Sequence, residues 1–363
     1  MVPPVSNHGA SHIPSLDGLR AVSISIVFIA HAGLDRVIPG GLGVTIFFVL
    51  SGYLITTLMR TESANHGAVS ISAFYTRRAF RILPLFYSVL TLAVVATLFL
   101  GLAGGSVNVA ATAAQYGHIT NYWAIFRGGF IPGTGVYWSL AVEEHFYLLF
   151  PVAFAFLQRR GVSLRNQARL FLGISAGVLL WRLALVHVWH VSVDRTYLAT
   201  DTRIDSILIG CAIAVALNPR LDTMPSVRTL RLSAGVSAAV LLGSLLLRTD
   251  AFRETFRYSI QSVAIAGLLI YVVACPTDLP GRLLNTRPMA WLGRLSFAFY
   301  LVHHVILLEY RDHWSAVPAA LLGLATALLV AVALQRLVEQ PAHRMRVRLL
   351  SRLAARQEPA TTA

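Results

Sequence analysis

Residues 47–56, FFVLSGYLIT, decide what kind of protein this chain forms. Large apolar side chains fill the stretch except at Ser51, Gly52 and Thr56, which indicates a helix enclosed by lipid or by other helices. Small residues in the middle of such a helix allow a second helix to approach closely, or allow a kink. Ser51 lacks the Gly-x-Ser-x-Gly turn of many nucleophilic serines, so the pattern favours a packing role for Ser51 and Gly52.

The composition extends this interpretation to the whole chain. Of 363 residues, 56% are hydrophobic and 13% are charged, and the mean hydropathy is +0.66. These values exclude an ordinary soluble domain and predict an all-α fold, a polytopic membrane helix bundle of about ten transmembrane helices. All 30 basic residues are arginine, which excludes a lysine nucleophile. The net charge of +14 is expected to reflect membrane-surface loops and not nucleic-acid binding.

Ten apolar runs are long enough, or nearly so, to cross a bilayer, which takes about 20 residues. The runs at 21–37 and 203–217 are short and carry polar groups, so we expect them to lie inside the bundle. Cys211 and Cys275 lie in or beside apolar runs, and neither a disulfide framework nor a metal site is expected. The predicted spans are 21–37, 42–59, 82–103, 139–157, 169–190, 203–217, 231–247, 258–275, 295–310 and 317–338.

Arginine-rich loops predict the orientation of the chain. They follow the second, fourth, sixth and eighth runs and the last one, whereas the loops on the other side carry few arginines, apart from 248–257. The positive-inside rule therefore predicts a multi-pass protein of the cell inner (plasma) membrane with both termini in the cytoplasm. Residues 1–345 are expected to form one membrane domain, and residues 346–363 a cytoplasmic, disordered tail.

Arg20 and His31 frame the first apolar run, RAVSISIVFIAH. A spacing of eleven residues at about 100° per residue brings both side chains to one helix face, about 16 Å apart along the axis. With the N-terminus in the cytoplasm, Arg20 lies at the inner interface and His31 near the midplane. The alternative is a snorkelling arginine and a histidine that is hydrogen-bonded within the core.

Residues 138–151, WSLAVEEHFYLLFP, put two adjacent carboxylates into an apolar helix. Glu143 and Tyr147 are four residues apart and share a face, with Trp138 nearby. The expected depth of Glu143 is close to that of His31, and a carboxylate that orients an imidazole forms a general-base pair. The alternative is an aromatic and acidic cap at the membrane interface.

Arg77, Arg78 and Arg81 lie in the stretch FYTRRAFRILP, residues 74–84. At helical spacing, two or three of their guanidinium groups share a face, which suits bidentate contacts to phosphate. Contact with lipid headgroups, or a positive-inside stop, is the simpler explanation when this stretch is taken alone.

Two further stretches place polar residues in apolar helices. Arg203 and Asp205 open the run at 203–217, where a structural ion pair is the default expectation. In LSFAFYLVHH, Tyr300 shares a helix face with His303 or His304, and a polar helix end is the alternative.

Together these stretches resemble the integral membrane O-acyltransferase family three, whose members O-acetylate bacterial surface glycans and some antibiotics. The resemblance runs in order from Ser15 to about Pro341. Relative to the usual family pattern, His145 replaces a glutamine and Val302 a tryptophan, and neither change removes a proposed catalytic group. Many members carry an additional soluble domain, for which this chain is expected to be too short. The resemblance is carried by SLDGLRA with Arg20 and His31, FFVLSGYLIT, RRAFRILP, WSLAVEEHFYLLFP, TRIDSILIG, LSFAFYLVHH and VEQP.

The resemblance implies an acyltransferase that moves an acetyl or other short acyl group from acyl-CoA, most simply acetyl-CoA, to a hydroxyl group. The acceptor would be a glycan, a lipid-linked sugar or a small secondary metabolite. His31, Glu143 and Arg20 would be the catalytic residues, and the arginines at 77, 78 and 81 would bind the donor's phosphates. Supporting roles would fall to Ser51, Gly52, Trp138, Tyr147, Arg203, Asp205, Tyr300 and His303.

Two alternatives stay open at this point. A covalent acyl-enzyme at His31 or Ser51 is a less favoured variant of the direct transfer. A transporter that moves glycan or acyl cargo without acyl-transfer chemistry belongs to a different class, and buried charges near the midplane are compatible with it.

Overall fold

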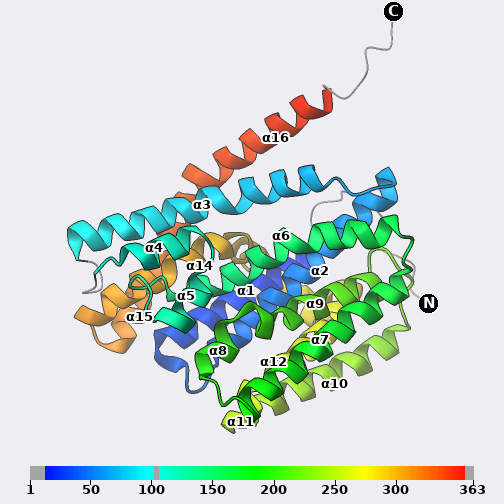
Figure 1. Ribbon diagram of the computed structural model, residues 1–363, viewed down its shortest axis with the longest axis horizontal. Coiled ribbons are helices and arrows are strands. Elements are labelled where there is room, and N and C mark those ends of the chain that lie inside the picture. Colours follow the sequence, from blue (N-terminus) through cyan, green and yellow to red (C-terminus); the bar gives the residue numbers. More distant parts are fainter. Residues whose placement is uncertain (1–12, 102–105, 356–363) are drawn as a thin grey trace, which may run out of the picture. The chain divides into compact units, whose positions relative to one another are not determined.

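The computed structural model describes residues 13–101 and 106–355, and its regular elements in these ranges are all helices (Figure 1). The prediction of an all-α helix bundle is therefore confirmed. The first twelve residues and the last eight, which include part of the expected tail, lie outside the described residues. Within the described part of the tail, helix α16 (Gln340–Ala355) continues past residue 346.

Nine helical segments of the described chain are long and apolar enough to cross a membrane. The predicted run at 203–217 is not among them, because it forms helix α9 (Thr200–Ala216), which has only 17 residues. Most of α9 is buried among other helices, as expected for this run, so its length need not match the bilayer. The nine segments are Ser15–Leu34, Gly40–His66, Ile71–Leu100, Gly135–Arg159, Leu164–His187, Val227–Leu246, Arg257–Ala274, Arg287–His313 and Ala316–Leu350.

The described residues divide into two compact units, and one of the points where the chain passes between them lies inside helix α14 (Arg287–His313). Unit 1 comprises the residues up to Val69, Gly117–Gly129 and Val136–Ser296. Besides α9, its helices are α1 (Pro14–Ile29), η1 (Ala30–Leu34), α2 (Gly40–His66), α5 (Thr120–Arg127), α6 (Trp138–Arg159), α7 (Leu164–His187), α8 (Val193–Leu198), α10 (Val227–Leu246), α11 (Asp250–Glu254), α12 (Arg257–Ala274) and α13 (Leu279–Leu284). Unit 2 holds α3 (Ile71–Leu100), α4 (Val109–Tyr116), α15 (Ala316–Leu334), η4 (Gln335–Glu339) and α16.

Helices α2 and α9 pack against each other through glycine. A Cβ atom added at Gly52 would lie 1.9 Å from the carbonyl oxygen of Ile207, and one added at Gly210 would lie 2.2 Å from that of Val49. Each glycine thus faces the backbone of the other helix. The prediction that Gly52 allows close helix approach is confirmed, and α2 continues through this point as one helix.

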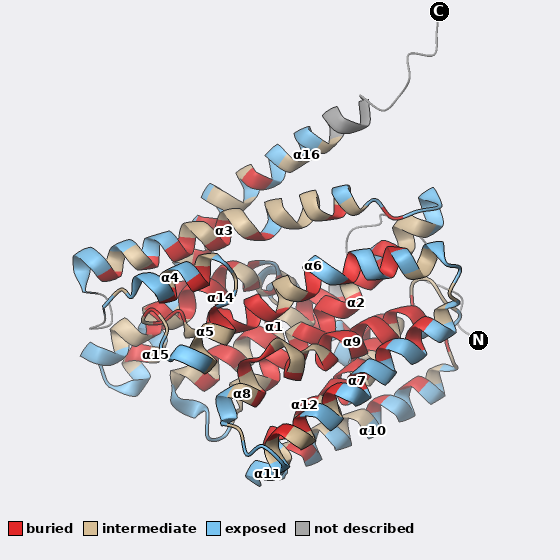
Figure 2. Cartoon of the chain, viewed as in Figure 1, coloured by how far each residue is buried: buried red, intermediate tan, exposed pale blue. Residues whose placement is uncertain are grey.

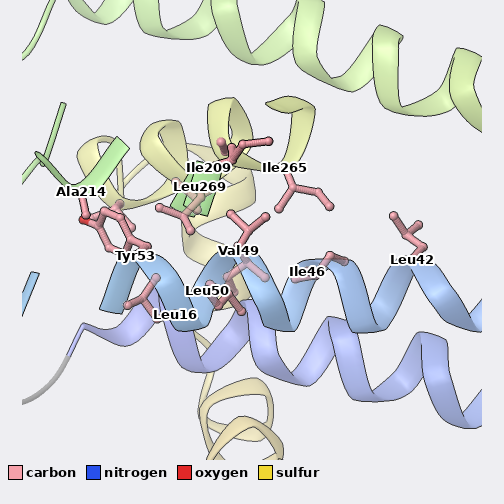
Figure 3. Packing of buried hydrophobic residues seen from close by; sticks show 14 residues of the cluster. Leu16, Leu42, Ile46, Val49, Leu50, Tyr53, Ile209, Ala214, Ile265 and Leu269 are labelled. Carbon is pink, nitrogen blue, oxygen red and sulfur yellow. The ribbon is translucent and has the colours of Figure 1, made fainter. Parts of the chain in front are cut away.

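The core of unit 1 forms around this contact. Buried apolar side chains of α2 meet those of α9 and α12, and Leu16 of α1 and Leu284 of α13 complete the cluster (Figure 3). Both α2 and α9 are buried over most of their lengths (Figure 2). The residues of α2 in the cluster are Leu42, Ile46, Val49, Leu50 and Tyr53.

A bidentate ion pair fixes the C-terminal half of α2 to the end of α9. Arg60 donates to both carboxylate oxygens of Asp222, at 2.9 and 2.7 Å, and to the carbonyl oxygen of Ala214 at 2.6 Å. Burial alone would raise the pKa of Asp222, but hydrogen bonds from Arg60 and from the backbone N–H of Asn218 hold it below its ordinary value. The loop after α9 is therefore tied to α2 by charge as well as by packing.

The outer helices of unit 1 expose apolar side chains. The most apolar window of α10 is only 17% buried, against 78% for the corresponding window of α2. Faces of this kind are a liability in water but match the interior of a bilayer, so they support a multi-pass membrane protein (Figure 2). The exposed large apolar side chains of α10 are Leu232, Val236, Val240, Leu242 and Leu246.

A charge pair is buried where α7, α9 and α12 meet. Arg182 and Asp205 are 0% exposed and 2.8 Å apart, and the Ser259 hydroxyl donates to the same carboxylate oxygen at 2.6 Å. The expected ion pair between Arg203 and Asp205 is therefore wrong, because Asp205 binds Arg182 instead. The sequence signal for this pair was the arginine in the otherwise apolar stretch GVLLWRLALVH of α7.

In unit 2, α3 packs along α16 and η4, segments far apart in the sequence (Figure 1). The rings of Tyr87 and Tyr116 stack at 5.6 Å and join α3 to α4, and the Tyr87 hydroxyl donates to the Tyr116 carbonyl oxygen at 3.2 Å. Glu339 and Pro341 of the VEQP motif lie where the π-helix η4 passes into α16. The motif thus marks a change of helix type.

Replacing Gly52 with alanine is expected to lower stability, because the Cβ would meet backbone at 1.9 Å. Overpacking of this kind costs ~1–3 kcal/mol, which exceeds the ~1 kcal/mol that alanine gains over glycine in a helix. The measurement is the melting temperature of Gly52→Ala in detergent. The control is Gly235→Ala in α10, where an added Cβ would have no atom within 4 Å. A lower value for Gly52→Ala alone is expected, and equal values would contradict the close contact.

Replacing one member of the Arg182–Asp205 pair is expected to lower the stability of the fold more than replacing both members together. Arg182→Met or Asp205→Leu alone leaves one charge buried without its partner, at a cost of ~3–5 kcal/mol, and the double variant recovers part of this. Thermal unfolding of the four proteins measures the coupling. The surface pair of Arg231, whose side chain is 60% exposed, and Asp278 is the control, with an expected coupling of ~0–1 kcal/mol. Additive effects at Arg182 and Asp205 would refute the buried pair.

Candidate active site

A chain of hydroxyl groups leads from α2 to a carboxylate of α6. Tyr147 donates from its hydroxyl to Glu143 Oε2 at 3.2 Å, as the four-residue spacing on α6 predicts. Ser51 is hydrogen-bonded to the same tyrosine hydroxyl. Since Tyr147 has one proton, which it gives to Glu143, Ser51 is the donor in the other bond. Ser51 and Tyr147 are buried and Glu143 is half-buried, so the carboxylate is held by a largely enclosed polar chain.

His31 lies on a turn of unusual geometry. The α-helical pattern of α1 ends at Ile29 and gives way to the π-helix η1, which contains His31 and is kinked at Gly33, whose φ is 110°. Only glycine adopts that angle without strain, so Gly33 permits the kink two residues after the histidine. Single π-turns are frequent at functional sites. His31 is half-buried, and its pairing with Glu143 stays a prediction.

Arg20 is held near the start of α1. Its guanidinium lies 3.6 Å from the carboxylate of Asp17, one helical turn earlier, and its side chain is 20% exposed. Helix α1 is pressed closely against its neighbours at this end, since a Cβ at Gly18 would lie 2.3 Å from the Leu284 carbonyl oxygen. The motif SLDGLRA therefore supplies both the acidic partner of Arg20 and the glycine that permits this packing.

Arg203 is fully buried inside a cage of aromatic rings. Its guanidinium carbon lies 3.9 Å from the centre of the Tyr258 ring, and its Nη2 donates to the hydroxyl of Thr45 at 3.1 Å. Such stacking stabilises a cation away from water because the ring faces carry partial negative charge. Trp138, predicted as a supporting residue, is thus brought to Arg203. The other rings within 5.3–5.6 Å of the guanidinium carbon are those of Tyr197, Trp138 and Phe48.

A second polar cluster joins α6 to the start of α9. His145 Nδ1 lies 2.7 Å from the hydroxyl of Thr200, which also accepts from the side-chain amide of Asn121 at 3.1 Å. The ring of Tyr122 stacks on that of His145 at 6.0 Å. Burial, with a smaller repulsion from His145, lowers the pKa of His118 to about 4. Sequence reasoning had singled out only His145 here, since Asn121, Tyr122 and His118 lie in a short helix and a loop without a recognisable motif, and Thr200 is the first residue of α9.

The remaining predicted residues lie in unit 2. Arg77, Arg78 and Arg81 occupy the first turns of α3, the first two half-buried and Arg81 exposed. Arg346 of α16 is close enough to Arg77 for their charges to repel, so the end of α3 concentrates positive charge. Such a concentration favours an anionic partner.

His303 is fully buried on α14, and its ring stacks on Phe299 at 5.8 Å. His303 Nδ1 lies 2.7 Å from the Tyr300 carbonyl oxygen. Because a carbonyl group only accepts, the proton sits on Nδ1. The adjacent His304 contacts the carbonyl oxygen of Gly133 at 3.1 Å. Tyr300 and His303 are therefore brought together within unit 2.

Comparison with known proteins identifies the family. Residues 13–336 match the family model described as "Acyltransferase domain". The peptidoglycan O-acetyltransferase OatA of Listeria monocytogenes is 26% identical over 93% of this chain and 56% of its own length. The putative peptidoglycan O-acetyltransferase YrhL of Bacillus subtilis is 32% identical over 82% of this chain and 49% of its own length. The O-acetyltransferase OatA of Staphylococcus aureus is 30% identical over 84% of this chain and 52% of its own length.

The chain spans about half the length of these relatives. No solved structure matches it at a significant level. The family match nevertheless takes in nearly all of the described helices, including those that carry Arg20, His31, Ser51 and Glu143. This chain therefore belongs to the acyltransferase family three that its sequence motifs resemble.

Proposed function

We propose that this chain is a membrane O-acetyltransferase that moves an acetyl group from acyl-CoA to a hydroxyl group of a cell-wall glycan. The observation that carries the proposal is the polar chain from Ser51 through Tyr147 to Glu143, inside a domain of the acyltransferase family. The named activity of the relatives supports peptidoglycan as the first acceptor to test. A lipid-linked sugar or a small hydroxylated metabolite is the next.

In this proposal His31 is the general base. Its imidazole takes the proton of the acceptor hydroxyl as the oxygen attacks the acyl carbonyl carbon. The carbon–sulfur bond of the donor then breaks, and the proton passes to the departing thiolate. Glu143 stabilises the transient imidazolium, and Tyr147 holds Glu143 in the orientation that this requires. Ser51 acts through Tyr147, so it is a positioning residue and not a nucleophile.

The donor's phosphates are assigned to the arginines at 77, 78 and 81. The nearby Arg346 supports this, because it adds to the positive charge at the end of α3. Arg20, the third predicted catalytic residue, is expected near the donor's phosphates, about 16 Å from His31 along the helix axis. Arginine binds phosphate through two parallel hydrogen bonds and keeps its charge at any biological pH. No metal takes part in this scheme.

The proposed orientation places both termini in the cytoplasm of a cell whose plasma membrane the chain spans. The arginine-rich loops support it, since they follow alternate spans. Acyl-CoA is made in the cytoplasm, so this orientation gives the donor direct access to the side on which Arg20 and the arginines of α3 are expected.

His31→Ala and Glu143→Gln are expected to lower acetyl transfer by about 10²–10⁴-fold, the usual worth of general-base catalysis. Tyr147→Phe, which removes one oriented hydrogen bond, should cost about tenfold. Transfer of radiolabelled acetyl from acetyl-CoA to peptidoglycan fragments by the purified protein is the measurement.

Two matched variants serve as controls. One removes a histidine and the other removes a hydroxyl–carboxylate hydrogen bond, both outside the candidate site. His187→Ala changes an exposed residue of α7, and Tyr271→Phe removes a hydroxyl that donates to Asp278 at 2.7 Å. Both should retain transfer. Near-normal transfer by both His31→Ala and Glu143→Gln would refute the base assignment.

Arg78→Ala and Arg81→Ala are expected to raise the KM for acetyl-CoA by about tenfold each while kcat changes little, because they remove uniform binding of the donor. Arg159→Ala changes an exposed arginine at the end of α6 that is predicted to face the same side, and it should leave KM unchanged. Variants that alter only the amount of protein in the membrane would favour contact with lipid headgroups.

A further inference from the structure

A hollow of about 340 Å³ opens in unit 1 between the segment after η1 and the segment that joins α10 to α12. It lies at the end of α1 that carries His31, at the opposite end of that helix from Arg20. Four of its lining side chains are arginines, and one is an aspartate, Asp35. The lining residues are Asp35, Arg36, Val37, Pro39, Ser244, Leu245, Leu247, Arg248, Arg253 and Arg257.

The positive charge of this hollow is poorly compensated. Arg248 donates to the backbone oxygen of Arg36 at 3.0 Å, which uses its guanidinium to hold the loop and leaves its charge unpaired. Arg253 has a carboxylate partner at 3.7 Å, Asp250, whose side chain is 92% exposed. Among the described residues, Arg36 and Arg257 have no carboxylate within ion-pair distance. The hollow therefore offers an anion the guanidinium groups of Arg36 and Arg257, and the charge of Arg248 adds to theirs.

The hollow is connected by direct packing to the candidate active site. The guanidinium carbon of Arg257 lies 5.2 Å from the centre of the Tyr258 ring. The same ring lies 3.9 Å from the guanidinium carbon of Arg203, which in turn lies 5.5 Å from the ring of Trp138 at the start of α6. Glu143 follows Trp138 by five residues on that helix. A series of direct contacts thus runs from the hollow to the helix that carries the candidate carboxylate.

The loop 248–257 is also the exception in the charge pattern of the chain. It carries three arginines, offset in part by Asp250 and Glu254, on the side where the other loops are predicted to carry few. The positive-inside rule does not explain arginines there, so a local explanation is needed. An anionic ligand that reaches the protein from that side would explain them.

We propose that this hollow binds an oxyanion, a carboxylate or phosphate, of the acyl acceptor, so that the preferred acceptor is an anionic glycan. The inference rests on the proposed function and deepens it by naming the substrate class and a specificity residue, Arg36. Two guanidinium groups would hold the anion, and the acceptor would extend from there toward the segment that carries His31. A phospholipid headgroup offers the same chemistry, and the experiment separates the two.

The test uses the full chain in nanodiscs of neutral phosphatidylcholine. The probes are an N-acetylhexosamine oligosaccharide that bears free carboxylates and the same oligosaccharide with its carboxylates amidated. Arg36→Gln should weaken binding of the acidic probe about tenfold, Arg36→Glu should weaken it further, and Arg36→Lys should restore most of it. Binding of the amidated probe should not change. Arg228→Gln, an exposed arginine at the other end of α10, is the control with the same loss of charge.

Three results separate this proposal from its rivals. Equal binding of the acidic probe by wild type, Arg36→Gln and Arg36→Glu would overturn it. In a second set of nanodiscs that contain phosphatidylglycerol, loss of that bound lipid in the Arg36 variants, with acidic-probe binding unchanged, would overturn it in favour of a lipid headgroup. If the wild type bound the acidic probe through Arg36 but transferred no acetyl group from acetyl-CoA to any hydroxyl acceptor, the anion site would stand and the proposed function would fall.

Discussion

The contact of backbone on backbone between α2 and α9 is the constraint on which the rest of unit 1 depends. Gly52 and Gly210 each leave room for a carbonyl group of the other helix, so the two helices lie closer than side chains would allow. Ser51 is the neighbour of Gly52, and the approach that the glycine permits also sets where its hydroxyl meets Tyr147. On the other helix, Arg203 lies two turns before Gly210 and contacts Thr45 of α2. Both polar groups are positioned by one feature of packing.

Two arginines are buried completely in this unit, and the protein stabilises them in different ways. Arg182 lies against a carboxylate and a hydroxyl group, in the manner of a buried ion pair. Arg203 instead lies among four aromatic rings, and it donates to the Thr45 hydroxyl at 3.1 Å and to the Tyr197 carbonyl oxygen at 3.4 Å. The first arrangement neutralises the charge, whereas the second keeps it. Helix α9 carries Arg203 and Asp205 and so contributes to both arrangements. With only 17 residues it is too short for an independent span, and most of it is buried among other helices.

The sequence predicted the features that depend on neighbours in the chain. Helix geometry alone was enough to predict three features. They are the apolar runs, the close helix approach at Gly52, and the shared face of Glu143 and Tyr147. Partners on helices far apart in the sequence could not be predicted, because they depend on which helices are adjacent in the fold. Asp205 was expected to bind Arg203, two residues away, and binds Arg182, 23 residues away. The aromatic cage is assembled from four helices, and no spacing in the sequence marks it.

The cage around Arg203 has a consequence for the electrical character of the protein. An ammonium group in so dry a place would readily shed its proton, whereas a guanidinium group holds its charge throughout the biological range of acidity. Since every cation of this chain outside its histidines is an arginine, the bundle carries a permanent positive field. The charge of Arg203 next to α2 and α6 is then the same in acidic surroundings as in neutral ones.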